Sequence, residues 1–154
     1  MKKILYFSSS KFPIAGLAGA IHSGMLPEGK ESAVSVLWNL PFMNSNQNSE
    51  GVIISLGEDK QGNKIFALSV KGDRELINRL IESIISIFKR APDELYLVNI
   101  KFKENSFVRT GWRLCHSALL APLGRAIIIA CFKKIYVSLS QLVSDQKEVT
   151  GKLT

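Results

Sequence analysis

The pattern of apolar and polar positions begins with a strand and a helix joined by a polar loop. Residues 4–7 form a short apolar run of the kind found in buried strands. Residues 14–23 are mostly small and apolar and end before Gly24, which is typical of a helix that stops at a glycine. Between them, residues 8–13 have the sequence Ser-Ser-Ser-Lys-Phe-Pro. The stretch therefore predicts a strand–loop–helix unit.

The next segments predict a short helix, a polar loop and a hairpin. Helical spacing of apolar positions marks residues 31–40, and Pro41 ends that helix. Residues 44–50 are polar and low in complexity, so we expect a mobile loop there. Two β-rich runs, residues 52–56 and 64–70, flank a polar connection that contains glycine and aspartate. This composition favours an antiparallel hairpin.

The second half of the chain alternates between helical and strand patterns. An apolar stripe with a period of 3.6 predicts a helix over residues 73–88 that packs one side on a sheet. Residues 94–100 and 126–130 are apolar runs that predict buried strands. Helices are expected over residues 105–120 and 133–144.

Together these elements predict a single α/β domain over residues 1–154. Strands that alternate with helices imply parallel crossovers, and the hairpin adds one antiparallel pair. We therefore expect a layered fold with a mixed, mostly parallel sheet of about five strands and helices on both faces. The polar residues 145–154 are expected to form a frayed tail.

The composition of the chain predicts a soluble, cytoplasmic protein. Apolar residues make up 46% of the chain and charged residues 21%, which are ordinary globular values. Cys115 and Cys131 fit no metal-binding spacing and are expected to be reduced core thiols. The apolar run after Met1 is four residues long, too short for a signal peptide. The run over residues 126–132 is seven long, too short to span a membrane.

The net charge of +7 is concentrated in the C-terminal third. Residues 1–100 carry 11 basic and 10 acidic side chains, whereas residues 101–154 carry 9 basic and 3 acidic ones. Such asymmetry indicates either an anionic partner or a solvated basic surface. Nucleic-acid binding has only this charge behind it, because no helix-turn-helix, zinc-finger or RNP-type aromatic motif is present.

The first loop is the predicted binding site. Ligands of open α/β sheets gather at the carboxyl ends of the strands, and a helix N-terminus there favours an anion. A phosphate or a nucleotide suits the hydroxyls and cations in this region, whereas nothing there suits a metal or another cofactor. The alternative is that the serines only cap the helix. The candidate anion ligands are Ser8, Ser9, Ser10, Lys11, His22, Asn99, Arg109, Arg125 and Lys133.

The same loop lacks the groups that catalysis needs. Residues 8–13 contain no Cys, His, Asp or Glu, and Phe12-Pro13 occupies the place where a P-loop has Lys followed by Ser or Thr. His22 is expected to pack or to interact with a helix dipole, and Asp59 to bond its own turn. We therefore expect a non-catalytic binding or regulatory module. The alternative is an enzyme of phosphate-ester or nucleotide chemistry whose site is not recognisable.

Several collinear motifs resemble a known family. They are Ile4-Leu5-Tyr6, Ala20-Ile21-His22-Ser23-Gly24-Met25-Leu26-Pro27, Leu40-Pro41-Phe42, Leu56-Gly57-Glu58-Asp59, Gly62-Asn63, Arg109-Thr110-Gly111 and Leu123-Gly124-Arg125. Over residues 3 to about 143 the chain is similar to a Firmicutes family of unknown function, catalogued as domain of unknown function 3189.

The resemblance implies a divergent first loop. Family members tend to carry His-Cys-Tyr-Gly-Gly-Ala-His-Ser-Ser where this chain has Phe-Ser-Ser-Ser-Lys-Phe-Pro-Ile-Ala over residues 7–15. Both the thiol and the loop histidine are missing, so an activity that uses them is not expected here. The unit is also faintly similar to low-molecular-weight protein phosphatases, but Ser8 stands in place of the nucleophilic Cys and the loop has no Arg.

Overall fold

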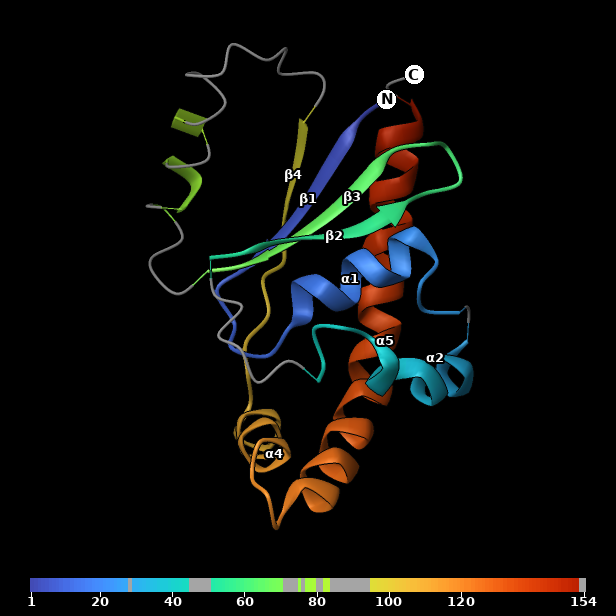
Figure 1. The fold of residues 1–154 in the computed structure, drawn as a ribbon. Coiled ribbons are helices and arrows are strands. Elements are labelled where there is room, and N and C mark those ends of the chain that lie inside the picture. Colours follow the sequence, from blue (N-terminus) through green and yellow to red (C-terminus); the bar gives the residue numbers. More distant parts are fainter. Residues whose placement is uncertain are drawn as a thin grey trace.

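The chain folds around one mixed sheet with the strand order β2-β3-β1-β4 (Figure 1). The computed structural model describes residues 1–27, 29–44, 51–70, 75, 77–79, 82–83 and 95–152. The strands are β1 (Lys3–Ser8), β2 (Ile53–Glu58), β3 (Lys64–Ser69) and β4 (Leu95–Asn99). Strand β1 is central and runs parallel to both β3 and β4, whereas β2 pairs antiparallel with β3. The α/β class and the predicted hairpin are confirmed.

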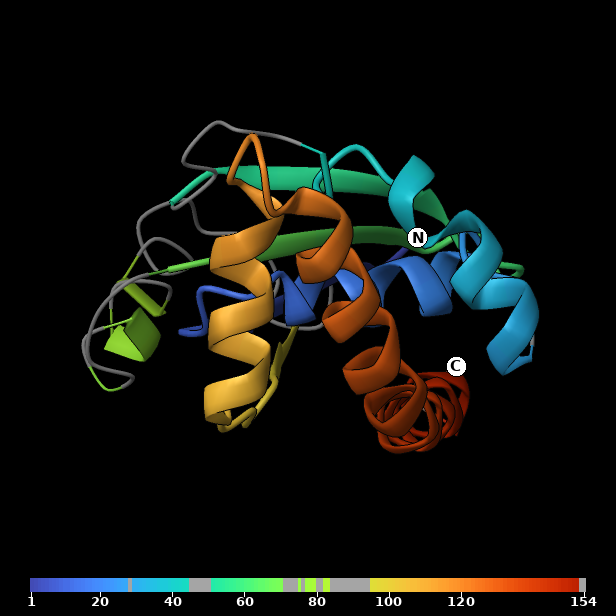
Figure 2. The same cartoon turned by 90° about the horizontal axis from the view of Figure 1, so that it is seen from below.

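Helix α1 (Ile14–Ser23) covers one face of the sheet and separates it from the C-terminal helix α5 (Ala121–Lys152) (Figure 2). Its bounds match the prediction, and Gly24 ends the helix with a φ of 80°, a left-handed conformation that glycine adopts without strain. Helix α2 (Lys30–Val36) continues as the 3₁₀ turn η1 (Leu37–Asn39). These two elements occupy the helix predicted over residues 31–40.

The predicted strand over residues 126–130 is wrong. Helix α4 (Ser106–Cys115) is followed by a single long helix, α5 (Ala121–Lys152), which contains those residues. The buried side chains of Ile128, Phe132, Leu139 and Val143 follow the helical period and face the core. A short run of isoleucines does not by itself distinguish a strand from a buried helix. The sheet therefore has four strands in the described part of the chain, not about five.

The expected frayed tail is largely helical. Residues 145–152 are the last two turns of α5, and Thr150 is buried. The Lys2 ammonium donates to the Thr150 carbonyl over 2.9 Å. The end of α5 is therefore held against the start of the chain, and both termini lie side by side in Figure 1.

Helices α4 and α5 form a hairpin that extends beyond the sheet at the bottom of Figure 1. Gly124 makes this close approach possible. A Cβ at this position would lie 2.7 Å from the Leu114 carbonyl carbon and 2.8 Å from the Gly111 oxygen, both of them backbone atoms of α4. Neither atom can move aside as a flexible side chain would.

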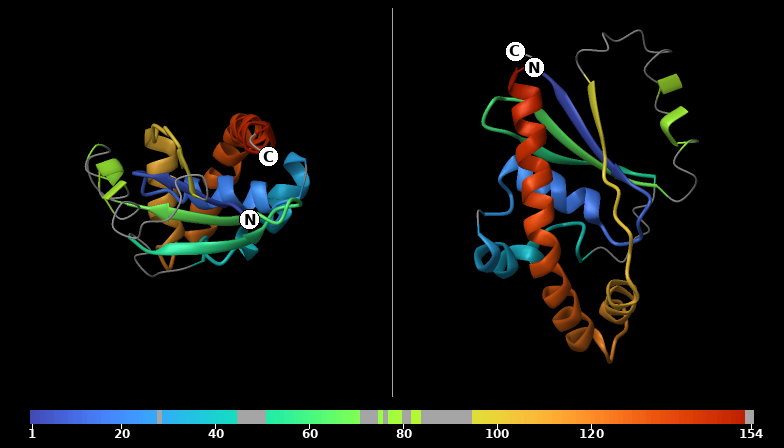
Figure 3. Two further views of the ribbon diagram at one scale, coloured as in Figure 1. Left: turned by 90° about the horizontal axis from the view of Figure 1, so that it is seen from above. Right: turned by 180° about the vertical axis from the view of Figure 1, so that it is seen from behind.

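The helix predicted over residues 73–88 is described only in part. Its described members, residues 75, 77–79 and 82–83, are helical, and they lie apart from α1 and α5 in both views of Figure 3. Ile77 packs with Leu5, Phe7 and Leu68, whose side chains point away from α1. Helical residues thus lie on both faces, as predicted. The other residues of that predicted helix and the loop predicted over residues 45–50 lie outside the described residues.

By length and composition alone, α5 could cross a membrane. The helix over Ala121–Gly151 contains an 18-residue window of mean hydropathy 1.6, of which 28% is buried. Core helices of soluble proteins pass the same test of length and composition, although they are mostly buried. In α5, Ile128 and Phe132 are fully buried against the rest of the fold. The absence of a membrane-spanning segment therefore stays a prediction.

Candidate functional site

The first loop leaves β1 at Ser8 and enters α1 after Pro13. Ser8 is buried, and its Oγ accepts a hydrogen bond from the Ser10 amide over 3.0 Å. Ser9 and Lys11 are exposed. No side chain caps the first turn of α1, and Pro13 supplies no amide hydrogen there. The Ser8 hydroxyl therefore shapes the loop, and the remaining donors of residues 10–12 face another segment of the chain.

That segment carries Glu104, whose carboxylate is the anion that the loop binds. Oε1 accepts a hydrogen bond from the Ser10 hydroxyl and another from the Phe12 amide, the latter over 2.9 Å. The Lys11 amide also donates to this carboxylate. Burial acts to raise the pKa of Glu104, but these hydrogen bonds outweigh it and hold the pKa below its usual value. Glu104 is therefore an ionised carboxylate at the predicted anion site.

Glu104 reaches the loop because it lies between the end of β4 and the start of α4. The Asn105 side chain caps α4 by accepting from the Val108 amide over 2.8 Å. One turn later Arg109 Nε lies 3.9 Å from Glu104 Oε2. Sequence reasoning missed Glu104, although its position four residues after a predicted strand placed it at the same sheet edge as the loop.

Only part of the predicted ligand set gathers at this edge. Asn99 ends β4 opposite Phe7 in the strand register, and Arg109 joins through its ion pair with Glu104. His22 lies near the other end of α1. The Arg125 guanidinium lies over the Trp38 ring, 5.2 Å from its centroid. Lys133 Nζ lies 2.9 Å from Glu31 Oε1. The contacts of these last three residues involve no member of the loop.

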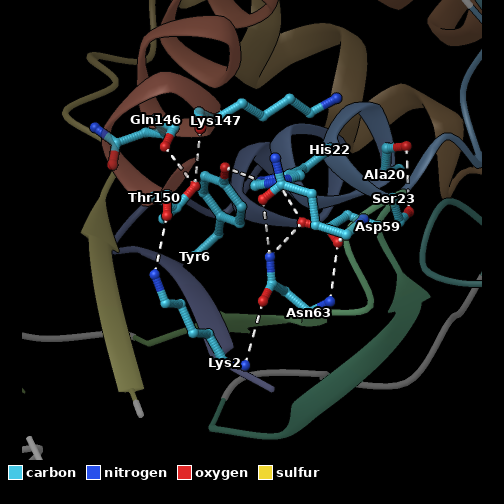
Figure 4. A network of polar contacts seen from close by, with 11 residues as sticks. Lys2, Tyr6, Ala20, His22, Ser23, Asp59, Asn63, Gln146, Lys147 and Thr150 are labelled. Carbon is cyan, nitrogen blue, oxygen red and sulfur yellow. Dashed lines mark hydrogen bonds and ion pairs between the residues drawn. The ribbon is translucent and has the colours of Figure 1, made fainter. Parts of the chain in front are cut away.

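A second polar cluster lies around His22, at the far end of α1 from the loop (Figure 4). The Tyr6 hydroxyl lies 2.6 Å from His22 Nδ1, and both side chains are buried. His22 Nε2 lies 3.3 Å from Asp59 Oδ2 but lacks a hydrogen bond of normal geometry. Asp59 accepts from the amides of Gln61 and Asn63, which confirms its predicted role in the turn.

The protonation states of the His22 cluster favour a structural role. Burial, helped by the nearby Lys147, lowers the pKa of His22 to about 4 against the opposing influence of Asp59, so the imidazole is neutral at pH 7. Burial also raises the pKa of the Tyr6 hydroxyl far above neutrality. A neutral imidazole and a protonated phenol, both shielded from water, connect β1, α1 and the β2–β3 turn. They carry no activated nucleophile.

The described residues contain no group of three or more His, Cys, Asp or Glu side chains that could hold a metal ion. Cys115 and Cys131 are free thiols, as expected, but they are half-buried rather than fully enclosed. The loop thus supplies hydrogen-bond donors for an anion and, within the described part of the chain, no metal centre beside them.

No curated protein and no solved structure matches the chain. One family model does match, and it spans residues 3–148, nearly the whole length described above. Its description is a protein of unknown function, DUF3189. With so much of the chain covered, this protein belongs to the DUF3189 family of proteins of unknown function.

Proposed function

We propose that this protein is a non-catalytic binding module whose first loop accepts an anionic group, and that Glu104 is the resident occupant of that loop. The observation behind the proposal is the convergence of the Ser10 hydroxyl and the Phe12 amide on one carboxylate. The external ligand would carry a phosphate or a carboxylate, which accepts the same hydrogen bonds. The free thiols support a cytoplasmic location.

Binding would be an exchange between two anions. An incoming phosphate replaces the Glu104 carboxylate on the loop donors, and the exposed Lys11 supplies charge beside it. A helix terminus contributes about 0.3–1 kcal/mol to an anion at an exposed site, so affinity is expected to be weak while Glu104 competes. Because Glu104 directly precedes Asn105, the cap of α4, its release would alter the segment that leads into that helix. In this way anion binding at the loop would change the segment before α4, and the module would have a regulatory role.

The loop offers little support for the alternative, a phosphate-ester or nucleotide-processing enzyme. Such an enzyme would use Ser10 as the nucleophile and Glu104 as its base, because these two side chains share a hydrogen bond. The pKa of Glu104 is lowered, however, which makes its carboxylate a weak base. The other serine with a defined role, Ser8, is buried and bonded to the loop backbone.

Titration with inorganic phosphate at low salt tests the proposal. Glu104→Ala removes the resident anion and should bind phosphate at least fivefold more tightly than the unmodified protein. Glu31→Ala is the matched control, because it removes an exposed carboxylate that pairs with Lys133 away from the loop. Adding Lys11→Ala to Glu104→Ala should reverse the gain. Equal affinities for Glu104→Ala and Glu31→Ala would contradict the proposal.

The same preparations test the enzymatic alternative. Incubation with p-nitrophenyl phosphate should give no turnover above the buffer rate. Hydrolysis that is lost in Ser10→Ala would overturn the non-catalytic assignment and favour the enzyme.

A further inference from the structure

Helix α5 has a second, mostly apolar row on the side opposite its buried face. Leu123, Ile127, Ala130, Lys134 and Val137 follow one another at intervals of four, three, four and three residues. Leu123 is 54% exposed and Val137 is 52% exposed. Alternating intervals of three and four are the spacing by which one helix packs along another. The outer row of α5, defined by these five residues, therefore has the pattern of a helix-packing surface. Ile127 lies against Gly111 of α4, whereas the other four residues of the row are exposed.

A groove runs beside the outer row. It has a volume of about 350 Å³ and lies between α5 and the segment that leads into α4. Ile127, Ala130 and Lys134 form one wall, while Phe107 and Lys103 line the opposite side. Phe107 is 71% exposed, which is unusual for a side chain of its size. The small side chain of Ala130 lets another backbone approach closely at the middle of the groove.

The positive charge of this region indicates which side chains a partner would carry. Residues 105–144 contain no acidic side chain, and their basic ones are Arg109, Arg113, Arg125, Lys133 and Lys134. Lys103 and Lys134 lie in the groove itself, and no acidic residue lines it. An occupant with acidic side chains beside its apolar row would complement these lysines.

We propose that the groove and the outer row of α5 dock an amphipathic helix of a partner protein, with acidic residues flanking its apolar positions. A second copy of this chain fits less well, because two such faces would bring the lysines of both copies together. An anionic bilayer would also attract the lysines of this region. It fits less well, because a flat bilayer surface does not fill the groove and because Lys134 lies within the outer row. The groove is lined by Lys103 and Asn105, which flank Glu104 in the chain, but by none of the loop residues 8–13. The docking proposal does not rest on anion binding at that loop.

Fluorescence anisotropy with synthetic peptides tests this docking. The probe is a labelled three-heptad helix with leucine at the packing positions and glutamate at the flanking ones, and its counterpart has lysine in place of glutamate. The acidic peptide should bind with a Kd at least tenfold lower than the basic one. Raised salt should weaken that binding.

Two variant pairs locate the binding on the surface. Val137→Ala should weaken binding of the acidic peptide at least threefold, whereas Val149→Ala should not, although both valines lie on α5 with 52% and 51% exposure. Lys134→Glu should weaken it at least fivefold, whereas Lys60→Glu, in the distant β2–β3 turn, should not. Phe107→Ala gives a third probe, and circular dichroism verifies that each variant is folded.

Each other outcome overturns the proposal. If the two peptides bind equally well, the partner does not need acidic side chains. If the two variants of a pair weaken binding equally, the peptide does not bind at the groove and the outer row. Sedimentation of the protein with phosphatidylserine vesicles, lost in Val137→Ala, would assign the surface to a membrane instead. A dimer in analytical ultracentrifugation that is lost in Val137→Ala would assign it to a second copy of the chain.

Discussion

The Ser10 hydroxyl donates a hydrogen bond to the Glu104 carboxylate, which lies 94 positions further along the chain. This contact joins the loop after β1 to the segment after β4, two strands that are neighbours in the sheet. It also places a negative charge where the helix N-terminus and the loop amides favour one. The loop was expected to take an anion from solution, and the fold supplies one from its own chain.

Glu104 should make a pH-dependent contribution to stability. Its pKa is lowered in the folded state, so its contribution is present above the pKa of an unfolded glutamate and is lost as the pH falls through the folded value. Glu104→Gln removes this contribution. Urea unfolding should show the largest difference between the two proteins near pH 7 and a much smaller one near pH 3. A difference that does not vary with pH would contradict the ionised contact.

Proton uptake by His22 should make the stability of the protein depend on pH in a different range. Its folded pKa of about 4 lies below the ordinary value of 6.5, so the unfolded chain takes up a proton first as the pH falls. Stability should therefore decline between pH 6.5 and pH 4, by roughly 3 kcal/mol if the whole shift is expressed. His22→Gln should lose stability overall but show a flatter profile in this window. Thermal unfolding followed across the window measures both slopes.

Ile77 should carry part of the second core. Ile77→Ala leaves a cavity against Leu5, Phe7 and Leu68, which predicts a loss of roughly 2–5 kcal/mol in the free energy of unfolding. Arg79→Ala is the control, since Arg79 is exposed two residues away. Its effect should stay within about 0.5 kcal/mol. Equal effects in chemical denaturation would show that the segment does not cover the sheet.

Two glycines of α5 should respond to alanine with opposite signs. Gly124→Ala forces a methyl group against the backbone of α4 and should destabilise the protein by roughly 1–3 kcal/mol. At Gly151 the nearest atom to a new Cβ is Gln61 Nε2, at 3.6 Å, so alanine there should add about 0.5–1 kcal/mol of helix stability. Melting temperatures of the two variants check the prediction. An unchanged melting temperature for Gly124→Ala would show that α4 and α5 can move apart here without a loss of stability.

Local patterns predicted the elements whose signals are local. Gly24 marks the end of α1, and the polar connection over residues 57–63 marks the hairpin, because a turn needs only its own residues. The isoleucines over residues 127–129 carry no such signal. They lie within the long helix α5, where Ile128 is buried in the core, and this packing involves residues far away in the chain.

Anion binding at the first loop stays a prediction from the serines and the helix start. The carboxylate that accepts hydrogen bonds from this loop, Glu104, comes from a segment far away in the chain. Sheet order brings the two together, since β4 pairs with β1 and its carboxyl end meets the loop. Lys133 was grouped with the loop because it follows the strand wrongly predicted over residues 126–130, which is part of α5. The contacts of Arg125 and Lys133 with Trp38 and Glu31 place both residues elsewhere.

The pKa of the Glu104 carboxyl, measured by NMR with and without sulfate, tests the central claim most directly. Sulfate keeps its charge throughout the titration and can compete for the Ser10 and Phe12 donors. Without sulfate the pKa of Glu104 should lie below the ordinary value for glutamate, and saturating sulfate should raise it towards that value as the carboxylate leaves the loop. An ordinary pKa without sulfate, or a lowered one that sulfate does not change, would contradict the account.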